Sequence, residues 1–226
     1  MSTPSLQIVL PCLDETAALP WVLDRIPAGV GAIVVDNGST DSSAEMAGGL
    51  GAQVVVAGRR GYGAACHAGL VAATADVVAV CDCDASIDPA DAVRLAALLE
   101  GADLVVARRR PVEPAAWPWP SRLANRELAR RVRRATGYRL ADVGPLRVAR
   151  REALLGLEIA DRRSGYPVET LLRAAAAGWQ VAQCDVPYRP RLGHSKVTGT
   201  WRGTLTAYRD MSRLLANLST APVAAR

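Results

Sequence analysis

The chain has 226 residues, of which 50% are hydrophobic and 22% charged, so it can bury a core and is not simply disordered. This length predicts a single domain. No apolar run reaches the roughly 18 residues of a membrane span, and Met1 to Pro4 contain no basic or apolar signal region, which predicts a cytoplasmic protein. The five cysteines are accordingly expected to be reduced thiols.

Short apolar runs alternate with helix-like stretches through the first hundred residues. The pattern predicts strands at 6–10, 32–35, 53–57, 77–81 and 104–107, and helices at 17–26, 42–50, 64–73 and 89–99. Because the strand runs are rich in Val and Ile and lack alternating polar residues, they indicate a mostly parallel sheet with helices on both faces.

The pattern changes after residue 107. Helices are predicted at 121–135, 167–177 and 201–218, an extended segment at 140–148 and a strand at 180–185. The 121–135 helix is amphipathic, with Leu128 and Val132 on one side and Arg126 and Arg130 roughly opposite. This helix and the tryptophans just before it predict docking on an anionic membrane surface. The alternative is a solvated basic face beside a loop that covers the core.

The charge of the chain is informative about its partners. Basic residues outnumber acidic ones by 27 to 22, and every one of them except Lys196 is arginine. This bias, with many alanines and no phenylalanine, is typical of GC-rich coding. In such a sequence, a single lysine indicates a position where arginine cannot replace it. The net charge of +5 indicates an anionic partner such as a nucleotide, a phosphorylated lipid, a membrane surface or a nucleic acid.

Two carboxylates follow the apolar strand at 77–81, in the sequence Asp82-Cys83-Asp84. In an open α/β sheet, ligands bind at the carboxyl ends of the strands. Carboxylates placed close together repel one another unless a cation joins them. A divalent ion shared with substrate phosphates is the usual solution. The pair therefore predicts a metal site, and the alternative is a turn that caps the following helix.

Three further loops are candidates for binding. The segment 36–41, Asp-Asn-Gly-Ser-Thr-Asp, is either a helix-capping turn or a carboxylate facing a nucleobase or ribose. The turn Gly61-Tyr62-Gly63 is not a dinucleotide fingerprint, because Cys66 replaces the third glycine and the turn follows the third strand. The basic loop at 189–196 can fold over a diphosphate, and its alternative is a solvated loop.

Seven segments in a fixed order carry a resemblance to a known family: 8–15, 34–41, 61–65, 82–84, 142–144, 165–169 and 191–196. Together they resemble family-2 glycosyltransferases of the GT-A fold, over roughly residues 6–200. The second half is similar to the branch of dolichyl- and polyprenyl-phosphate sugar synthases. The resemblance implies an α/β GT-A domain over 1–226, with a Rossmann-like nucleotide-sugar half at 1–107, a mixed acceptor half at 108–200 and a C-terminal helix and tail at 201–226.

The resemblance implies a donor site at matching positions. The residues that would hold the nucleotide's base and ribose are Pro11, Glu15, Asp36 and Ser39, while Gly61 would let the backbone approach the nucleotide. Asp82 and Asp84 would bind Mg or Mn, and His194 lies where some GT-A enzymes place a third metal ligand. Two departures remove charge near the nucleotide, because Asn37 replaces an aspartate and Tyr62 replaces a lysine found in many members.

The remaining implied roles concern the reaction. Arg191 and Lys196 would neutralise the diphosphate or an acceptor phosphate. Asp142 and Glu169 would face the acceptor, and either could be the general base for a hydroxyl acceptor. The expected activity is an inverting transfer from a nucleotide diphosphate sugar to polyprenyl phosphate at the inner membrane face, or to a soluble hydroxyl. No nucleic-acid partner is expected.

Two other classes of protein are weighed against this one. A sugar-phosphate nucleotidylyltransferase would need a glycine-rich loop after the first strand, yet residues 11–16 contain no glycine. A non-catalytic module that binds anions or membranes explains the arginines but leaves the Asp-x-Asp without a role.

Overall fold

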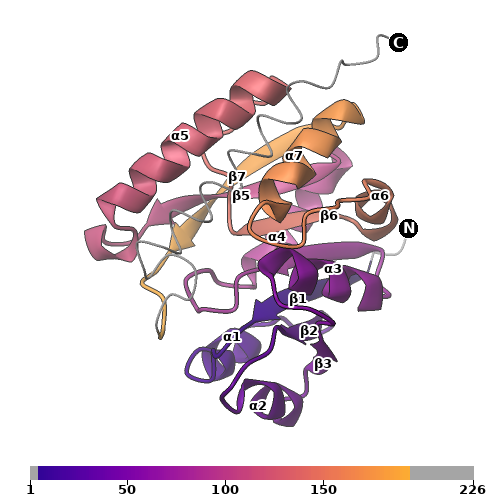
Figure 1. Ribbon diagram of the computed structural model, residues 1–226, viewed down its shortest axis with the longest axis vertical. Coiled ribbons are helices and arrows are strands. Elements are labelled where there is room, and N and C mark those ends of the chain that lie inside the picture. The colour runs from indigo at the N-terminus through magenta and orange to yellow at the C-terminus, as the bar shows by residue number, and fades with distance from the viewer. Residues whose placement is uncertain (1–4, 194–226) are drawn as a thin grey trace.

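The computed structural model of the protein describes residues 5–193 (Figure 1), so the helix predicted at 201–218 lies outside the described residues. The strands are β1 Leu6–Cys12, β2 Gly31–Asp36, β3 Gln53–Val56, β4 Val77–Cys81, β5 Leu104–Pro111, β6 Leu146–Arg150 and β7 Val181–Tyr188. The helices are α1 Leu19–Asp24, α2 Ser43–Gly49, α3 Tyr62–Ala72, α4 Asp91–Ala97, α5 Trp119–Thr136, α6 Arg151–Gly156 and α7 Tyr166–Ala176.

One sheet runs through this part of the chain, with its strands in the order β3-β2-β1-β4-β6-β5-β7. Neighbouring strands are parallel except at β6, which pairs antiparallel with both β4 and β5. The predicted mostly parallel sheet is therefore confirmed, and the antiparallel strand lies in the half that was expected to be mixed.

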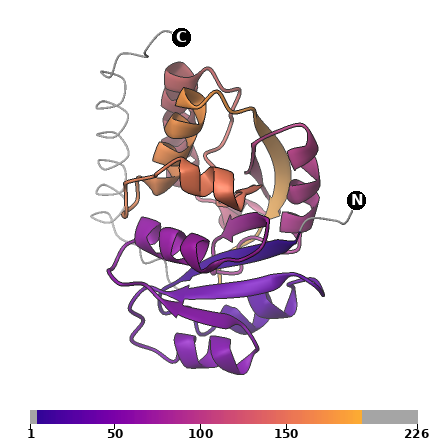
Figure 2. The same ribbon diagram turned by 90° about the vertical axis from the view of Figure 1, so that its right-hand side faces the viewer.

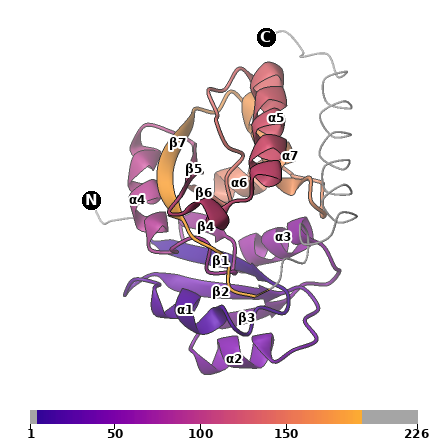
Figure 3. The same ribbon diagram turned by 90° about the vertical axis from the view of Figure 1, so that its left-hand side faces the viewer.

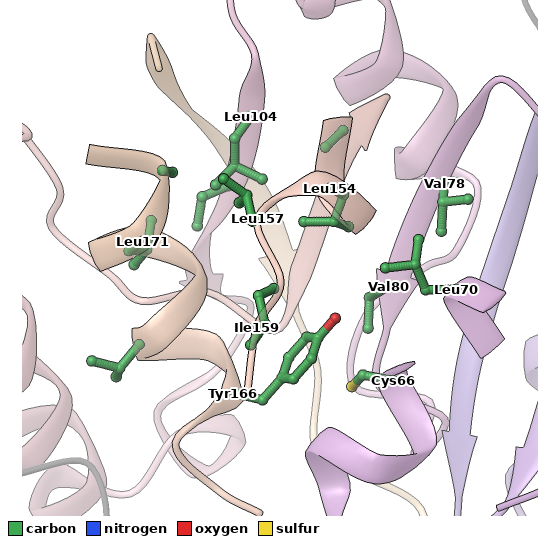
Figure 4. Close-up of a cluster of buried hydrophobic side chains, with 14 of the residues drawn as sticks. Cys66, Leu70, Val78, Val80, Leu104, Leu154, Leu157, Ile159, Tyr166 and Leu171 are labelled. Atoms are coloured by element: carbon green, nitrogen blue, oxygen red, sulfur yellow. The ribbon is translucent and has the colours of Figure 1, made fainter. Parts of the chain in front are cut away.

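Helices cover both faces of the sheet, which forms the middle layer (Figures 2 and 3). One core contains side chains of α3, α5, α6 and α7, and Figure 4 shows part of it, with Tyr166 lying between Ile159 and Cys66. The other core lies under α1, α2 and α4. Strand β4 is buried along its whole length because each of its faces meets one of these cores, as its unbroken apolar sequence predicts.

The predicted elements within residues 5–193 are present, with bounds that differ by a few residues, and three differences bear on the fold. Strand β5 continues to Pro111 because its basic residues still pair with β7. The extended segment predicted at 140–148 is regular only from Leu146, since the chain before it turns at Gly144, which has φ +67°. Helix α6 was not predicted, because six residues are too few for a clear hydrophobic period.

This topology brings the candidate residues together. Strands β1, β2 and β4 are parallel neighbours, so their carboxyl ends at Cys12, Asp36 and Cys81 meet at one edge of the sheet.

Among residues 5–193, no helix is both long enough and apolar enough to cross a bilayer.

Candidate active site

A cavity of about 350 Å³ opens at this edge of the sheet. Its lining comes from the loops after β1, β2 and β4 on one side, and from α5, β6 and the start of α7 on the other. The charged side chains that line it are Glu15, Asp82, Asp84, Arg109, Arg147 and Arg191. Carboxylates and guanidinium groups therefore share one cavity between the two halves of the fold.

Asp82 lies half-buried just beyond the end of β4. Its carboxylate accepts a hydrogen bond from the Tyr62 hydroxyl at 3.1 Å, and no guanidinium of residues 5–193 forms an ion pair with it. Burial, together with the charge of Asp84, raises the pKa of Asp82 to about 6. A carboxylate that is costly to ionise in this way fits a site completed by a cation.

Asp84 is fixed by its own turn. Its Oδ1 accepts hydrogen bonds from the backbone N–H of Ser86 at 3.0 Å and from the Ser86 hydroxyl. Ala85, between them, has φ +62°, a left-handed conformation that is unfavourable for a residue with a side chain. Strain of this kind concentrates at functional sites. The turn leaves Oδ2 directed at Arg191, whose Nη1 lies 3.5 Å away.

Arg191 forms ion pairs with the loop after β1 and with the loop after β4. Its guanidinium pairs with Glu15 at 3.0 Å as well as with Asp84. The segment after β7 is fixed by its backbone, because the N–H of Leu192 donates to the carbonyl of Asp84 and that of Arg189 to the carbonyl of Ser86. The end of this segment is therefore a built part of the cavity wall. Lys196 and His194, which follow it, lie outside the described residues.

Hydroxyl and carboxylate groups connect the loops after β1 and β2. The N–H of Glu15 donates to the Ser43 hydroxyl at 2.9 Å, and the N–H of Asp14 to the Ser39 hydroxyl at 3.0 Å. Asp36, 9% exposed, accepts from the N–H of Ser39 at 3.1 Å. Asp36 and Ser39 therefore stabilise the loops beside the cavity and do not themselves line it.

Gly61 is required by the protein's own backbone. It has φ +141°, and a Cβ there would lie 2.2 Å from the carbonyl oxygen of Arg162. Its N–H donates to the Asn37 side chain at 2.9 Å. These contacts give a reason for the glycine that needs no nucleotide. Asn37, which does line the cavity, is oriented by this bond.

Asp142 is 1% exposed and does not line the cavity. It forms a two-pronged ion pair with Arg109, with Nη2 to Oδ1 at 2.7 Å and Nε to Oδ2 at 2.9 Å. It also accepts the backbone N–H groups of Arg109 and Gly144. Although burial opposes it, the Arg109 guanidinium holds the pKa of Asp142 below its ordinary value. This carboxylate fixes Arg109, which in turn stacks 4.0 Å from the Trp117 ring.

Glu169 is 2% exposed and is likewise absent from the cavity wall. Its carboxylate accepts the backbone N–H groups of Ala160 at 3.0 Å and Asp161 at 2.6 Å, and pairs with Arg173 at 2.6 Å. Burial opposes ionisation, but these donors keep the pKa of Glu169 below its ordinary value. Its position indicates that it holds the loop before α7 in place.

The structure therefore divides the residues expected in the site. Five line the cavity: Pro11, Glu15, Asp82, Asp84 and Arg191. Asp36, Ser39 and Gly61 support the loops around it, while Asp142 and Glu169 are buried and tied to arginine and backbone partners. Within residues 5–193 no group of three or more His, Cys, Asp or Glu side chains is arranged to hold a metal ion.

Sequence reasoning missed two arginines that line the cavity, Arg109 and Arg147. Arg109 is one of three consecutive arginines, and nothing in that run distinguishes the one that turns inward. Arg147 carries a clearer signal, because it interrupts an apolar strand at a position where a charged residue is rarely buried.

Comparisons with known proteins agree with this geometry. The family model described as "Glycosyl transferase family 2" matches residues 8–156. An uncharacterised glycosyltransferase of Mycobacterium tuberculosis is 51% identical over 96% of this chain and 100% of its own length. A dolichyl-phosphate hexose transferase of Haloferax volcanii is 31% identical over 85% of this chain and 86% of its own.

A solved structure extends the likeness to the fold. It is glucosyl-3-phosphoglycerate synthase from Mycobacterium tuberculosis in complex with Mn²⁺, uridine diphosphate and glucosyl-3-phosphoglycerate. The alignment has a TM-score of 0.77 at 25% sequence identity, and covers 97% of this chain and 81% of the synthase.

Proposed function

Because the chain belongs to glycosyl transferase family 2, we propose that its cavity binds a nucleotide diphosphate sugar through a divalent cation and transfers the sugar to an acceptor. The expected family, fold and enzyme class are confirmed. The observation that carries the proposal is the Asp82 and Asp84 pair at the cavity wall, where Asp82 forms no ion pair with a residue of 5–193. The synthase with Mn²⁺ and uridine diphosphate supports the same donor chemistry.

The residues present fit a hard divalent cation. Such an ion prefers carboxylate oxygens and keeps room for substrate phosphates, and here two carboxylates stand beside an open cavity. Asp82 and Asp84 would hold Mg or Mn, with the donor's diphosphate supplying further oxygens. When bound, the ion adds positive charge beside the leaving diphosphate.

The protein's own groups account for the rest of the donor site. Arg191, fixed by Glu15, brings a guanidinium next to Asp84, where negative charge grows as the diphosphate leaves. Pro11 and Asn37 line the wall beside it, on the side of the cavity that we assign to the base and ribose. Lys196 is proposed to add a second cation to the same diphosphate.

The acceptor is proposed to carry a phosphate, as in a polyprenyl phosphate. A hydroxyl acceptor needs a general base, but Asp142 and Glu169 are both buried and tied to arginine. The carboxylates that line the cavity, among residues 5–193, are Glu15, Asp82 and Asp84, all at the donor end. A phosphate is already anionic and attacks without a base. The sugar's anomeric configuration is proposed to invert by attack from the face opposite the leaving group.

A transfer assay tests the function. Purified protein is incubated with Mn²⁺, a panel of uridine and guanosine diphosphate sugars, and farnesyl phosphate as a short polyprenyl acceptor. The expected product is a farnesyl phosphate sugar, whose anomeric configuration is read by NMR. Free farnesol serves as the matched acceptor without phosphate. Transfer to farnesol at an equal rate would contradict the phosphate acceptor.

The metal site gives a prediction about pH. Since burial raises the pKa of Asp82 to about 6, a cation that binds below that pH must displace a proton. Affinity for Mn²⁺ is therefore expected to be constant above pH 7 and to fall by up to about tenfold per pH unit below 6. Titration of free Mn²⁺ by EPR between pH 5 and pH 8 measures this. An affinity that does not change across that range would count against the role given to Asp82.

An interfacial position is also proposed, because apolar side chains are exposed at the start of α5 and in the segment between β5 and α5. Trp119 is 75% exposed, Leu123 59% and Val112 57%, and the exposed Arg126 lies on the same helix. Tryptophan and leucine beside arginine are typical of surfaces that enter the headgroup region. Each arginine near an anionic surface contributes on the order of 1 kcal/mol.

Vesicle sedimentation checks this position. The wild-type protein should bind vesicles that contain anionic lipid, and binding should weaken with salt. Trp119→Ala combined with Arg126→Glu should remove most of it, whereas Leu98→Ala, at an exposed site in another part of the fold, should leave it unchanged. Equal binding to neutral and anionic vesicles would refute docking without affecting the assignment of the family.

A further inference from the structure

Arg147 is a buried guanidinium without an ion-pair partner among residues 5–193. It lies on β6 and is 7% exposed. Its Nη2 donates to the carbonyl oxygens of Val143, at 2.6 Å, and Gly144, while its Nε is buried with no hydrogen-bond partner. A buried charge without an ion-pair partner is destabilising, so packing alone does not explain this arginine.

Another arginine that lines the cavity, Arg109, has partners within the protein. Arg109 is neutralised by Asp142 at 2.7 Å, bonded to Asn125 at 3.1 Å and stacked on Trp117. Its Nε and Nη2 both donate to side chains of the protein. Arg147 has two carbonyl oxygens as hydrogen-bond acceptors, which fix one end of the guanidinium but carry no formal counter-charge.

Arg147 and Arg191 contact different parts of the cavity wall. Arg191 serves the Asp84 end of the cavity. In the antiparallel pairing of β4 and β6, Arg147 stands opposite Val80, and its charge acts on Asp82 from beyond ion-pair distance. The loop at 143–145 and the start of α7, which lie around Arg147 in the cavity wall, belong to the acceptor half.

A second unsatisfied group lies in the same place. The hydroxyl of Tyr166 is buried without a partner, and it shares with Arg147 a small cavity of about 10 Å³. Figure 4 shows the Tyr166 ring beside Ile159, Cys66 and Val80. Arg147 lines both this cavity and the large one. Two residues with unsatisfied donors therefore line one small cavity in the acceptor half.

We propose that Arg147 binds the anionic phosphate of a phosphomonoester acceptor, at the cavity wall formed by β6, the loop at 143–145 and the start of α7. This inference rests on the proposed function and adds to it the residue that selects the acceptor. A bound phosphate supplies the missing counter-charge and places its oxygen toward the donor's sugar. Both a lipid phosphate and a soluble phosphate ester have this chemistry.

The test measures binding to two probes by calorimetry in the presence of uridine diphosphate and Mn²⁺. Farnesyl phosphate represents the lipid source and 3-phosphoglycerate the soluble source, with farnesol as the uncharged control. The wild-type protein should bind one phosphate ester and not farnesol. Arg147→Met should weaken that binding about ten- to a hundredfold, the range for a hydrogen-bonded charge, and Arg147→Lys should lose less.

Three readouts separate binding from a structural role. Affinity for uridine diphosphate with Mn²⁺ should stay within about twofold in both variants, and the melting temperature of Arg147→Met should not fall, because the change removes an unpaired charge. Arg150→Met, on the exposed side of the same strand, is the matched control and should bind the phosphate ester as the wild type does.

Either of two results would overturn this inference and leave the proposed function intact. One is unchanged binding of the phosphate ester by Arg147→Met, and the other is a variant that loses affinity for uridine diphosphate only. A wild-type protein that binds no uridine diphosphate in the presence of Mn²⁺ would instead overturn the proposed function, and this inference with it.

Discussion

Replacement of Asp84 by asparagine is expected to lower sugar transfer by about a hundredfold or more while the protein stays folded. The change keeps an oxygen that can accept the Ser86 N–H, so the turn that contains Ala85 can persist. It removes the negative charge that, together with Asp82, makes this wall of the cavity suited to a divalent cation. The expected loss therefore lies in turnover and in metal affinity.

Initial rates over a range of Mn²⁺ concentrations measure this effect, with circular dichroism and the melting temperature as checks on folding. Asp24→Asn is the control, because its side chain is 84% exposed and lies on α1. Full activity of a folded Asp84→Asn protein at low Mn²⁺ would show that the cation is not held where we place it.

Replacement of Asp142 by alanine is expected to destabilise the protein by about 3–5 kcal/mol, the cost of leaving a buried charge without its partner. Arg109 would keep its stacking on Trp117 but lose both prongs of its ion pair. The backbone N–H groups of Arg109 and Gly144 would lose their acceptor as well. The effect should therefore appear first as a loss of stability.

Urea denaturation of the variant and the wild type measures the difference in free energy of unfolding. Asp142→Ala combined with Arg109→Met is the matched double variant, and it should recover part of the lost stability because no charge is left unpaired. If Asp142→Ala is as stable as the wild type but inactive, then Asp142 acts in catalysis and our structural assignment is wrong.

The first half of the fold could be predicted because its physical causes are local. Unbroken Val and Ile runs predict buried parallel strands, and parallel neighbours bring their polar carboxyl ends to one edge. The order β4-β6-β5 could not be derived, since pairing across β6 depends on residues distant in the sequence. The pairing of β6 with β4 also places Arg147 in the cavity wall, so that position could not be predicted either.

The residues of the site divide on the same principle. Asp82 and Asp84 are neighbours that follow a recognisable strand, so the sequence is enough to place them together. Asp142 looks like a free carboxylate until its partner Arg109, 33 residues away, is known. The ion pair of Glu169 could have been predicted from the local sequence, because Arg173 lies four residues later on the same helix, a spacing at which such pairs form.

The central claim is that the cavity binds a nucleotide diphosphate through a cation held by Asp82 and Asp84. Calorimetric titration of uridine diphosphate and guanosine diphosphate, with Mn²⁺ and with EDTA, tests it most directly. The account predicts measurable binding of at least one of them with Mn²⁺, a large loss with EDTA, and the same loss in Asp84→Asn. Binding of equal strength with and without the metal would contradict it.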